Sequence, residues 1–155
     1  MPNSNFGPEH IKMLFRLVPD DDGYPPVAVE GLWVKKLESG NVILDNVPFY
    51  AKGIASGDEL AVQENTDGET WFDELVCSDG ASVFRIISQV DKLLRIREDL
   101  LDLGLPSEVS LKMCLIAVEV PLAKDIVPVL NYLVSGRESR LFDFEEGVLR
   151  HAIPV

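Results

Sequence analysis

The sequence predicts an α+β protein in which an N-terminal small β-barrel-like sheet packs against a C-terminal ferredoxin-like β-α-β(β)-α-β unit. Short segments that alternate apolar and polar residues fill the first half of the chain, whereas two later segments repeat apolar residues every three or four positions. Strand-like segments flank both helical segments. We expect a tail over 1–10, a β-rich lobe over 11–81, an α+β lobe over 82–149 and a tail over 150–155, with the lobes packed as one compact unit.

The β-rich lobe is predicted from five short strands with turn residues between them. Gly31 is expected to form a β-bulge, because the alternation changes phase there. The turn 65–68 reads Asn-Thr-Asp-Gly between two alternating segments, which favours a hairpin. Closely spaced strands of this kind are typical of a small barrel. The five expected strands are 11–18, 27–38, 41–47, 58–64 and 69–77.

The α+β lobe is predicted from two amphipathic helices. Ser88 is expected to cap the first helix, which ends at Gly104. The second begins near Asp125, because Pro128 is tolerated only in a first turn. We expect a turn and a strand over 78–88, one long strand or a hairpin over 107–120, and a strand over 141–149. The expected buried stripes are Val90, Leu93, Leu94, Leu100 and Leu101 in the first helix and Ile126, Val127, Leu130, Leu133 and Val134 in the second.

Composition excludes several classes of protein. Hydrophobic residues make up 46% and charged residues 26% of 155, as in a globular chain. The net charge of −12 argues against direct binding of nucleic acid or of an anionic membrane, because both require cations. No secretory leader or apolar run of about 18 residues is recognisable, so we expect a cytoplasmic protein that does not bind membranes. Cys77 and Cys114 are expected to be small buried hydrophobic residues.

Motifs for metal or nucleotide binding are incomplete. Asp20, Asp21 and Asp22 before Gly23 resemble the opening of a calcium loop, but the twelfth position, where a bidentate Glu belongs, is Gly31. A solvated turn is the better interpretation. The segment 53–58 holds two glycines like a phosphate-binding loop, yet acidic residues follow where Lys and Ser or Thr are needed. We expect no metal and no cofactor.

Catalytic groups are equally sparse. His10 and His151 lie near opposite termini, and neither has a nucleophile or further ligands beside it in the sequence. A shared role remains open, because termini can meet in space. Asp143 and Glu145 lie on one face of a strand and could act as an acid and base pair, although solvated carboxylates are the commoner reading. We expect no catalytic residue and no enzyme.

The most distinctive stretch runs from Gly53 to Gly80. It contains eight carboxylates and no Lys or Arg. If its strands alternate, many of these side chains face water beside aromatic residues. The stretch is then either a solvated sheet or a docking surface for a basic partner. The predicted partner-binding residues are Asp58, Glu59, Glu64, Asp67, Glu69, Trp71, Asp73, Glu74 and Asp79.

Three runs carry a resemblance to a known family. They are Pro-Pro-Val-x-x-Glu-Gly-Leu-Trp over 25–33, Asn-Val-Pro-Phe-Tyr-Ala-Lys-Gly-Ile-Ala-x-Gly-Asp over 46–58, and Glu-Glu-Gly over 145–147, with Ser-Val-Phe-Arg-Ile between them. The chain resembles domain-of-unknown-function family 4265, over about 11–149. The family name implies no activity and no catalytic residues. Its members look like small bacterial proteins that include cognate immunity partners of secreted toxins.

These observations together favour an acidic cytoplasmic immunity protein. Its partner is expected to be a cognate basic toxin domain, a nuclease, whose active-site region it covers. The alternative is a small-molecule-binding protein or enzyme with a ligand groove between the two lobes. A third possibility is a structural module of a larger assembly, which predicts self-association.

Overall fold

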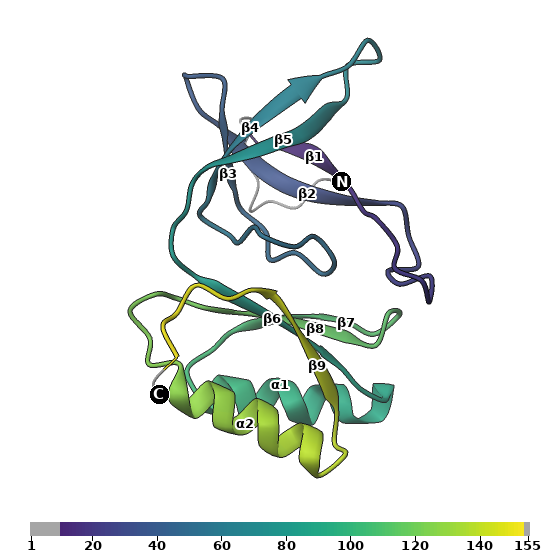
Figure 1. Cartoon of the computed structure of the whole chain (residues 1–155), viewed down its shortest axis with the longest axis vertical. Coiled ribbons are helices and arrows are strands. Elements are labelled where there is room, and N and C mark those ends of the chain that lie inside the picture. Colours follow the sequence, from purple (N-terminus) through teal and green to yellow (C-terminus); the bar gives the residue numbers. More distant parts are fainter. Residues whose placement is uncertain (1–9, 154–155) are drawn as a thin grey trace. The chain divides into compact units, whose positions relative to one another are not determined.

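The computed structural model describes residues 10–153, and its contacts divide the chain into two compact units. The first unit ends at Asp79 and the second begins at Gly80. Figure 1 shows that the first contains only strands and loops and that the second contains both α-helices. The chain is therefore an α+β protein, as predicted.

The first unit is a closed five-stranded barrel. Successive strands pair in antiparallel fashion, and the parallel pairing of β1 with β5 closes the barrel. A closed sheet has no free edge at which another strand could add. The prediction of a barrel-like sheet is confirmed. Its strands are β1 (His10–Arg16), β2 (Val29–Lys36), β3 (Val42–Leu44), β4 (Glu59–Glu64) and β5 (Thr70–Cys77).

Alternating apolar residues fill the barrel interior. Met13 pairs with Leu32, and both are almost completely buried. The predicted bulge at Gly31 is wrong, because the pairing of β1 with β2 continues through Gly31 without a shift. Gly31 instead leaves room for the side chain of Lys12, which a Cβ would meet at 2.8 Å. The other fully buried strand residues are Val34, Val42, Leu44 and Leu60.

The second unit has the element order β-α-β-β-α-β. Its sheet has the order β7-β8-β6-β9, and every neighbouring pair is antiparallel. The segment predicted as one long strand or a hairpin over 107–120 is a hairpin. Figure 1 shows both α-helices on one face of this sheet. The elements are β6 (Ser82–Ile87), η1 (Val90–Lys92), α1 (Leu93–Asp102), β7 (Ser107–Ser110), β8 (Leu115–Val120), α2 (Val127–Glu138) and β9 (Asp143–Val148).

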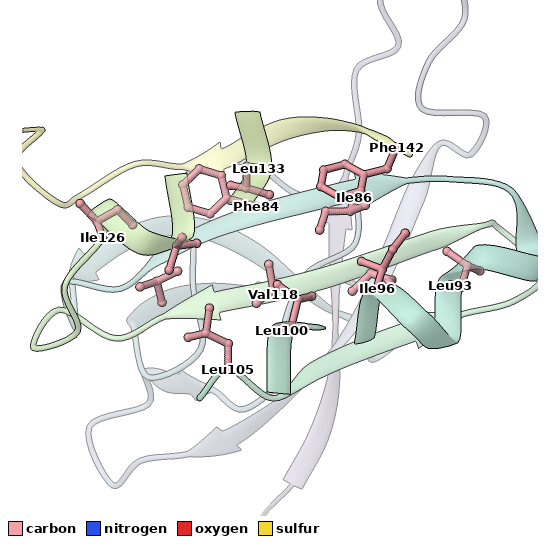
Figure 2. Close-up of a cluster of buried hydrophobic side chains, with 13 residues drawn as sticks. Phe84, Ile86, Leu93, Ile96, Leu100, Leu105, Val118, Ile126, Leu133 and Phe142 are labelled. Atoms are coloured by element: carbon pink, nitrogen blue, oxygen red, sulfur yellow. The ribbon is translucent and has the colours of Figure 1, made fainter. Parts of the chain in front are cut away.

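The core of the second unit lies between the helices and the sheet (Figure 2). Phe84 and Ile86 point toward it from β6, while Leu93, Ile96 and Leu100 enter it from α1. Burying side chains of this size contributes about 1.5–3 kcal/mol each before conformational entropy is subtracted. The predicted helical stripes were partly wrong, since Val90, Leu94, Leu101, Val127 and Val134 are exposed, and Ile96 and Val129 are buried instead.

The end of α2 has a requirement for glycine that periodicity did not reveal. A Cβ on Gly136 would lie 2.1 Å from the ring of Phe142, so only glycine lets that ring pack against the helix. The backbone N–H of Leu141 donates to the Gly136 carbonyl at 2.9 Å. The helix therefore ends where the chain turns back to begin β9.

Two local predictions were wrong. Ser88 does not cap the first helix, because its hydroxyl donates to the Leu141 carbonyl at 2.8 Å. Gln89 and Lys92 take the N-cap positions of η1 and α1, neither with a side-chain hydrogen bond. Cys77 is exposed rather than buried, and Cys114 is half-buried with a φ of 55°. Cys77 is the last residue of β5 and Cys114 immediately precedes β8. At these strand ends, the alternation that suggested burial no longer holds.

Candidate functional site

The acidic stretch folds mainly into the hairpin of β4 and β5, which Figure 1 shows ending in an exposed loop. Asn65 fixes this loop, because its side-chain oxygen accepts the N–H groups of Asp67 and Glu69 at 3.1 and 2.9 Å. Its amide also donates to the Glu69 carboxylate at 2.8 Å. Glu64, Asp67 and Glu69 are all exposed at this end of the hairpin.

Further along the hairpin, an irregular register brings two carboxylates to the surface together. The pairing shifts between Ala61 and Val62, so that Phe72 pairs with Val62 but Glu74 pairs with Ala61. Asp73 falls at the shift, and both Asp73 and Glu74 are exposed. Because a bulge interrupts strict alternation, consecutive acidic residues can both face water. Strict alternation would have turned one of them into the barrel.

Asp58 does not lie on this surface, which corrects the expectation that it faces water. Its side chain is completely buried, and its two oxygens accept the N–H groups of Ala55 and Asp79 at 2.8 and 3.0 Å. Asp58 therefore joins the turn before β4 to the segment that follows β5. Glu59 is half-buried and accepts the Asn41 amide at 2.8 Å, whereas Asp79 is exposed.

The fold also places cations beside a stretch that contains none. The guanidinium of Arg16 from β1 lies 4.9 Å from the ring centre of Trp71, a cation–π distance. Trp71 is half-buried, so Arg16 covers part of the aromatic surface predicted to contact a partner. Lys12 lies similarly 4.7 Å from the ring centre of Trp33. The surface therefore has an acidic hairpin edge and cations stacked on its tryptophans.

A cavity of about 700 Å³ lies at one end of the barrel, in the size range of small-ligand sites. Lys12 and Lys36 line it together with Glu64 and Glu69. Apolar side chains such as Val42 and Val62 complete the lining. Two of the predicted partner-binding carboxylates thus belong to a concave surface inside the first unit. The groove predicted between the lobes stays a prediction.

The residues of the three motif runs largely maintain the fold. The Glu30 carboxylate accepts three backbone N–H groups, from Phe49, Tyr50 and Ala51, at 2.7, 3.0 and 2.7 Å. The first run therefore fixes the loop formed by the second. Asn46 adds a second connection between these runs, because its side-chain oxygen accepts the Trp33 N–H at 3.1 Å. The side-chain oxygens of Glu30 and Asn46 therefore already accept hydrogen bonds from backbone N–H groups.

The third motif run is joined to β6 by a buried arginine. Arg85 is fully buried, and its Nε donates to the Glu145 carboxylate at 3.4 Å. A Cβ on Gly147 would lie 2.7 Å from the guanidinium, so glycine makes room for Arg85. Asp143 instead accepts Arg137 Nε at 2.8 Å. Asp143 and Glu145, the possible acid and base pair, thus each contact a different arginine.

The two histidines have separate partners. His10 contacts the Asp45 carboxylate at 2.8 Å, and His151 contacts the hydroxyl of Ser82 at 2.7 Å and the Pro121 carbonyl at 2.9 Å. A hydroxyl beside an imidazole is the arrangement of an activated nucleophile. Ser82 is nevertheless fully buried and accepts two backbone N–H groups, from Arg150 and His151. This contact, across 69 residues of sequence, joins the chain end to β6.

The described part of the chain offers neither a cluster of metal ligands nor a helix that could span a membrane. Between residues 10 and 153, no three side chains of His, Cys, Asp or Glu lie close enough to hold a metal ion. The Asp20 carboxylate accepts the N–H groups of Asp22 and Tyr24, as expected for a turn. Neither α-helix in these residues has the length and apolar character needed to cross a bilayer.

Comparison with known proteins agrees with this architecture. A crystal structure described as that of a hypothetical protein from Neisseria gonorrhoeae superposes with a TM-score of 0.74. It is 19% identical, and the match covers 91% of this chain and 96% of that one, which shows a shared fold. No curated protein matches the chain significantly. The family of the domain of unknown function DUF4265 matches residues 30–144, which include the whole second motif run and the end of the first, and the chain belongs to that family.

Proposed function

We propose that this protein is an acidic immunity protein, which acts in the cytoplasm and inhibits a cognate secreted toxin. The observation that carries the proposal is the exposed acidic hairpin. Its carboxylates form no ion pair with the rest of the described chain (residues 10–153), so their charge is available to a partner. The five exposed carboxylates of the hairpin are Glu64, Asp67, Glu69, Asp73 and Glu74.

A nuclease is the partner that this charge suits best. Nucleases present Lys and Arg to phosphates, so an acidic hairpin can occupy the same cations without offering a bond to cleave. Opposed potentials raise association rates about 10 to 1,000-fold. Affinity then depends on apolar and aromatic contacts near the hairpin, for which half-buried Trp71 is the best placed residue.

The experiment is affinity capture with tagged protein from a lysate of the source bacterium, followed by association kinetics with the captured protein. Replacing the five exposed carboxylates with Ser should slow association about tenfold or more and weaken its salt dependence. A matched control replaces five exposed carboxylates of the second unit, which changes the net charge equally. They are Asp91, Glu98, Asp102, Glu108 and Glu138.

The two five-residue variants separate local recognition from overall charge. If both slow association equally, net charge acts and the hairpin is not the binding surface. If neither does while both fold, the immunity proposal loses its structural support. Capture of only acidic proteins would contradict it as well, because like charges facing each other oppose binding.

A small-molecule-binding role is the second candidate, favoured by the cavity of about 700 Å³ in the first unit. A small molecule that copurifies and is lost in Lys36→Ala would support it.

The second unit has a β-α-β-β-α-β order and the strand order β7-β8-β6-β9, and these support our assignment of a ferredoxin-like fold. Fold by itself assigns no activity, so neither candidate function depends on it.

A further inference from the structure

A second cavity, shallow and widely open to solvent, with a volume of about 690 Å³, lies in the second unit at the junction of α2, β9 and the start of the first helix. Three cations line it: Lys92, Arg137 and Arg140. Asp143 is the one acidic residue among its described lining residues. The cavity therefore carries a local positive charge in a protein whose net charge is −12. Its other lining residues are Ser88, Gln89, Leu141 and Phe142.

Arg137 is held in place by its neighbours. Its Nε donates to the Asp143 carboxylate at 2.8 Å, its Nη2 donates to the Phe144 carbonyl at 2.6 Å, and its guanidinium lies 3.8 Å from the Phe144 ring centre. The Asp143 carboxylate thus compensates the charge of Arg137. Among residues 10–153, Lys92 and Arg140 have no side-chain hydrogen bond or ion pair, so their two charges are uncompensated.

Both uncompensated residues are unfavourable choices for their positions. Arg140 has a φ of 63°, in the left-handed region just beyond α2, where glycine is the usual residue. Lys92 takes the N-cap position of α1 without a side-chain capping hydrogen bond, and the positive end of the helix dipole disfavours a cation there. Residues that are locally unfavourable and converge on one cavity are typical of functional sites.

We propose that this cavity binds a phosphate group, carried by a small phosphomonoester. A dianionic phosphate would compensate Lys92 and Arg140 together, and a guanidinium can donate two parallel hydrogen bonds to it. Gln89, whose side chain makes no capping hydrogen bond, supplies a neutral donor at the rim. The cavity has room for an organic group beside the phosphate. This site is independent of the acidic hairpin and of the proposed immunity function.

The test uses thermal unfolding of the full chain followed by circular dichroism, with inorganic phosphate and with glucose 6-phosphate as probes. Sodium chloride at matched ionic strength is the reference. At a tenfold excess over its dissociation constant, a ligand should raise Tm by about 4 °C. A larger shift with the phosphomonoester than with phosphate would identify the ester as the ligand class. Equal shifts would mean that the site recognises free phosphate, which overturns that part of the proposal.

Arg140→Gly is the decisive variant. Glycine suits the left-handed backbone, so the unliganded variant should unfold at the same or a higher temperature while the phosphate-dependent shift is lost. Lys92→Gln should behave similarly. Arg97→Gln, which removes an exposed cation of α1 outside the cavity, should keep the full shift. A phosphate shift that survives in both cavity variants, or no shift beyond that of chloride, would overturn the proposal.

Amide chemical shifts locate the site independently of stability. Phosphate should move the resonances of 88–92 and 137–143, the two segments that contain the lining residues of the cavity. If the largest changes instead appear near Lys12 and Lys36, phosphate binds the barrel cavity and the assignment is wrong.

Discussion

The two units of this protein are stabilised in different ways. In the second unit, two helices bury large apolar side chains against a four-stranded sheet (Figure 2). In the first unit, two carboxylates, Glu30 and Asp58, hold the connections between strands by accepting backbone N–H groups. Acidic residues in one stretch of sequence therefore have opposite roles, since Asp58 is buried while Glu74 faces water.

The two units can be followed separately. Trp33 and Trp71 both belong to the first unit, and both α-helices belong to the second. Tryptophan fluorescence therefore reports on the barrel, and circular dichroism at helical wavelengths reports on the helix-bearing unit. Because the chain has two units, the two transitions need not coincide.

The largest effect is expected for Gly136→Ala. The added methyl group collides with the buried Phe142 ring, and overpacking of this kind costs about 3 kcal/mol. Urea unfolding followed by circular dichroism should show the loss, with a smaller change in fluorescence. Ser135→Ala, on the same turn but exposed, is the control. A stable Gly136→Ala variant would show that the ring can move aside.

A smaller effect, on the barrel, is expected for Glu30→Gln. An amide cannot accept the three N–H groups that Glu30 accepts, so the loss should be about 2 kcal/mol. Tryptophan fluorescence during urea unfolding measures it. Glu38→Gln, at an exposed position, should change stability by less than about 0.5 kcal/mol. If the two variants are equally stable, the carboxylate does not hold the loop at 49–51.

Asp58→Asn and Glu74→Gln compare a buried and an exposed carboxylate within the acidic stretch. The first removes an acceptor for the N–H groups of Ala55 and Asp79 and should cost about 1.5 kcal/mol. The second should be neutral within about 0.5 kcal/mol. The same fluorescence measurement applies to both. Equal losses would mean that burial does not distinguish structural from surface carboxylates here.

The smallest effect concerns Asp143. Hydrogen bonding to the Phe144 N–H, and then to Arg137, lowers the pKa of this carboxyl below its usual value. Its folded pKa is therefore lower than its unfolded pKa, and the stabilisation is present above the unfolded pKa and lost as pH falls through the folded one. Asp143→Asn should reduce this acid dependence slightly, because the side chain is mostly exposed. Unfolding at several acidic pH values by circular dichroism measures it, and a variant with unchanged acid dependence would contradict the assignment.

Local patterns in the sequence determined the elements, because strand alternation, helical periodicity and turn residues are properties of neighbouring positions. They predicted the five barrel strands and the two helices, and the motif runs identified the family. Local patterns gave wrong predictions where the residues packed against an element determine burial and available space. The exposure of Leu94 and Leu101, the burial of Asp58 and the space required at Gly136 depend on what packs against each residue.

The candidate sites also differ in whether local sequence patterns could predict them. The acidic hairpin was predictable, since its charges and its turn are contiguous in sequence. The tertiary structure alone placed Arg16 over Trp71, and it alone assembled Lys92, Arg137 and Arg140 around one cavity. The physical reason is that charge and packing act through space, across separations of tens of residues that no local period records. Net charge is thus determined by the sequence, but the place where each charge acts is decided by the fold.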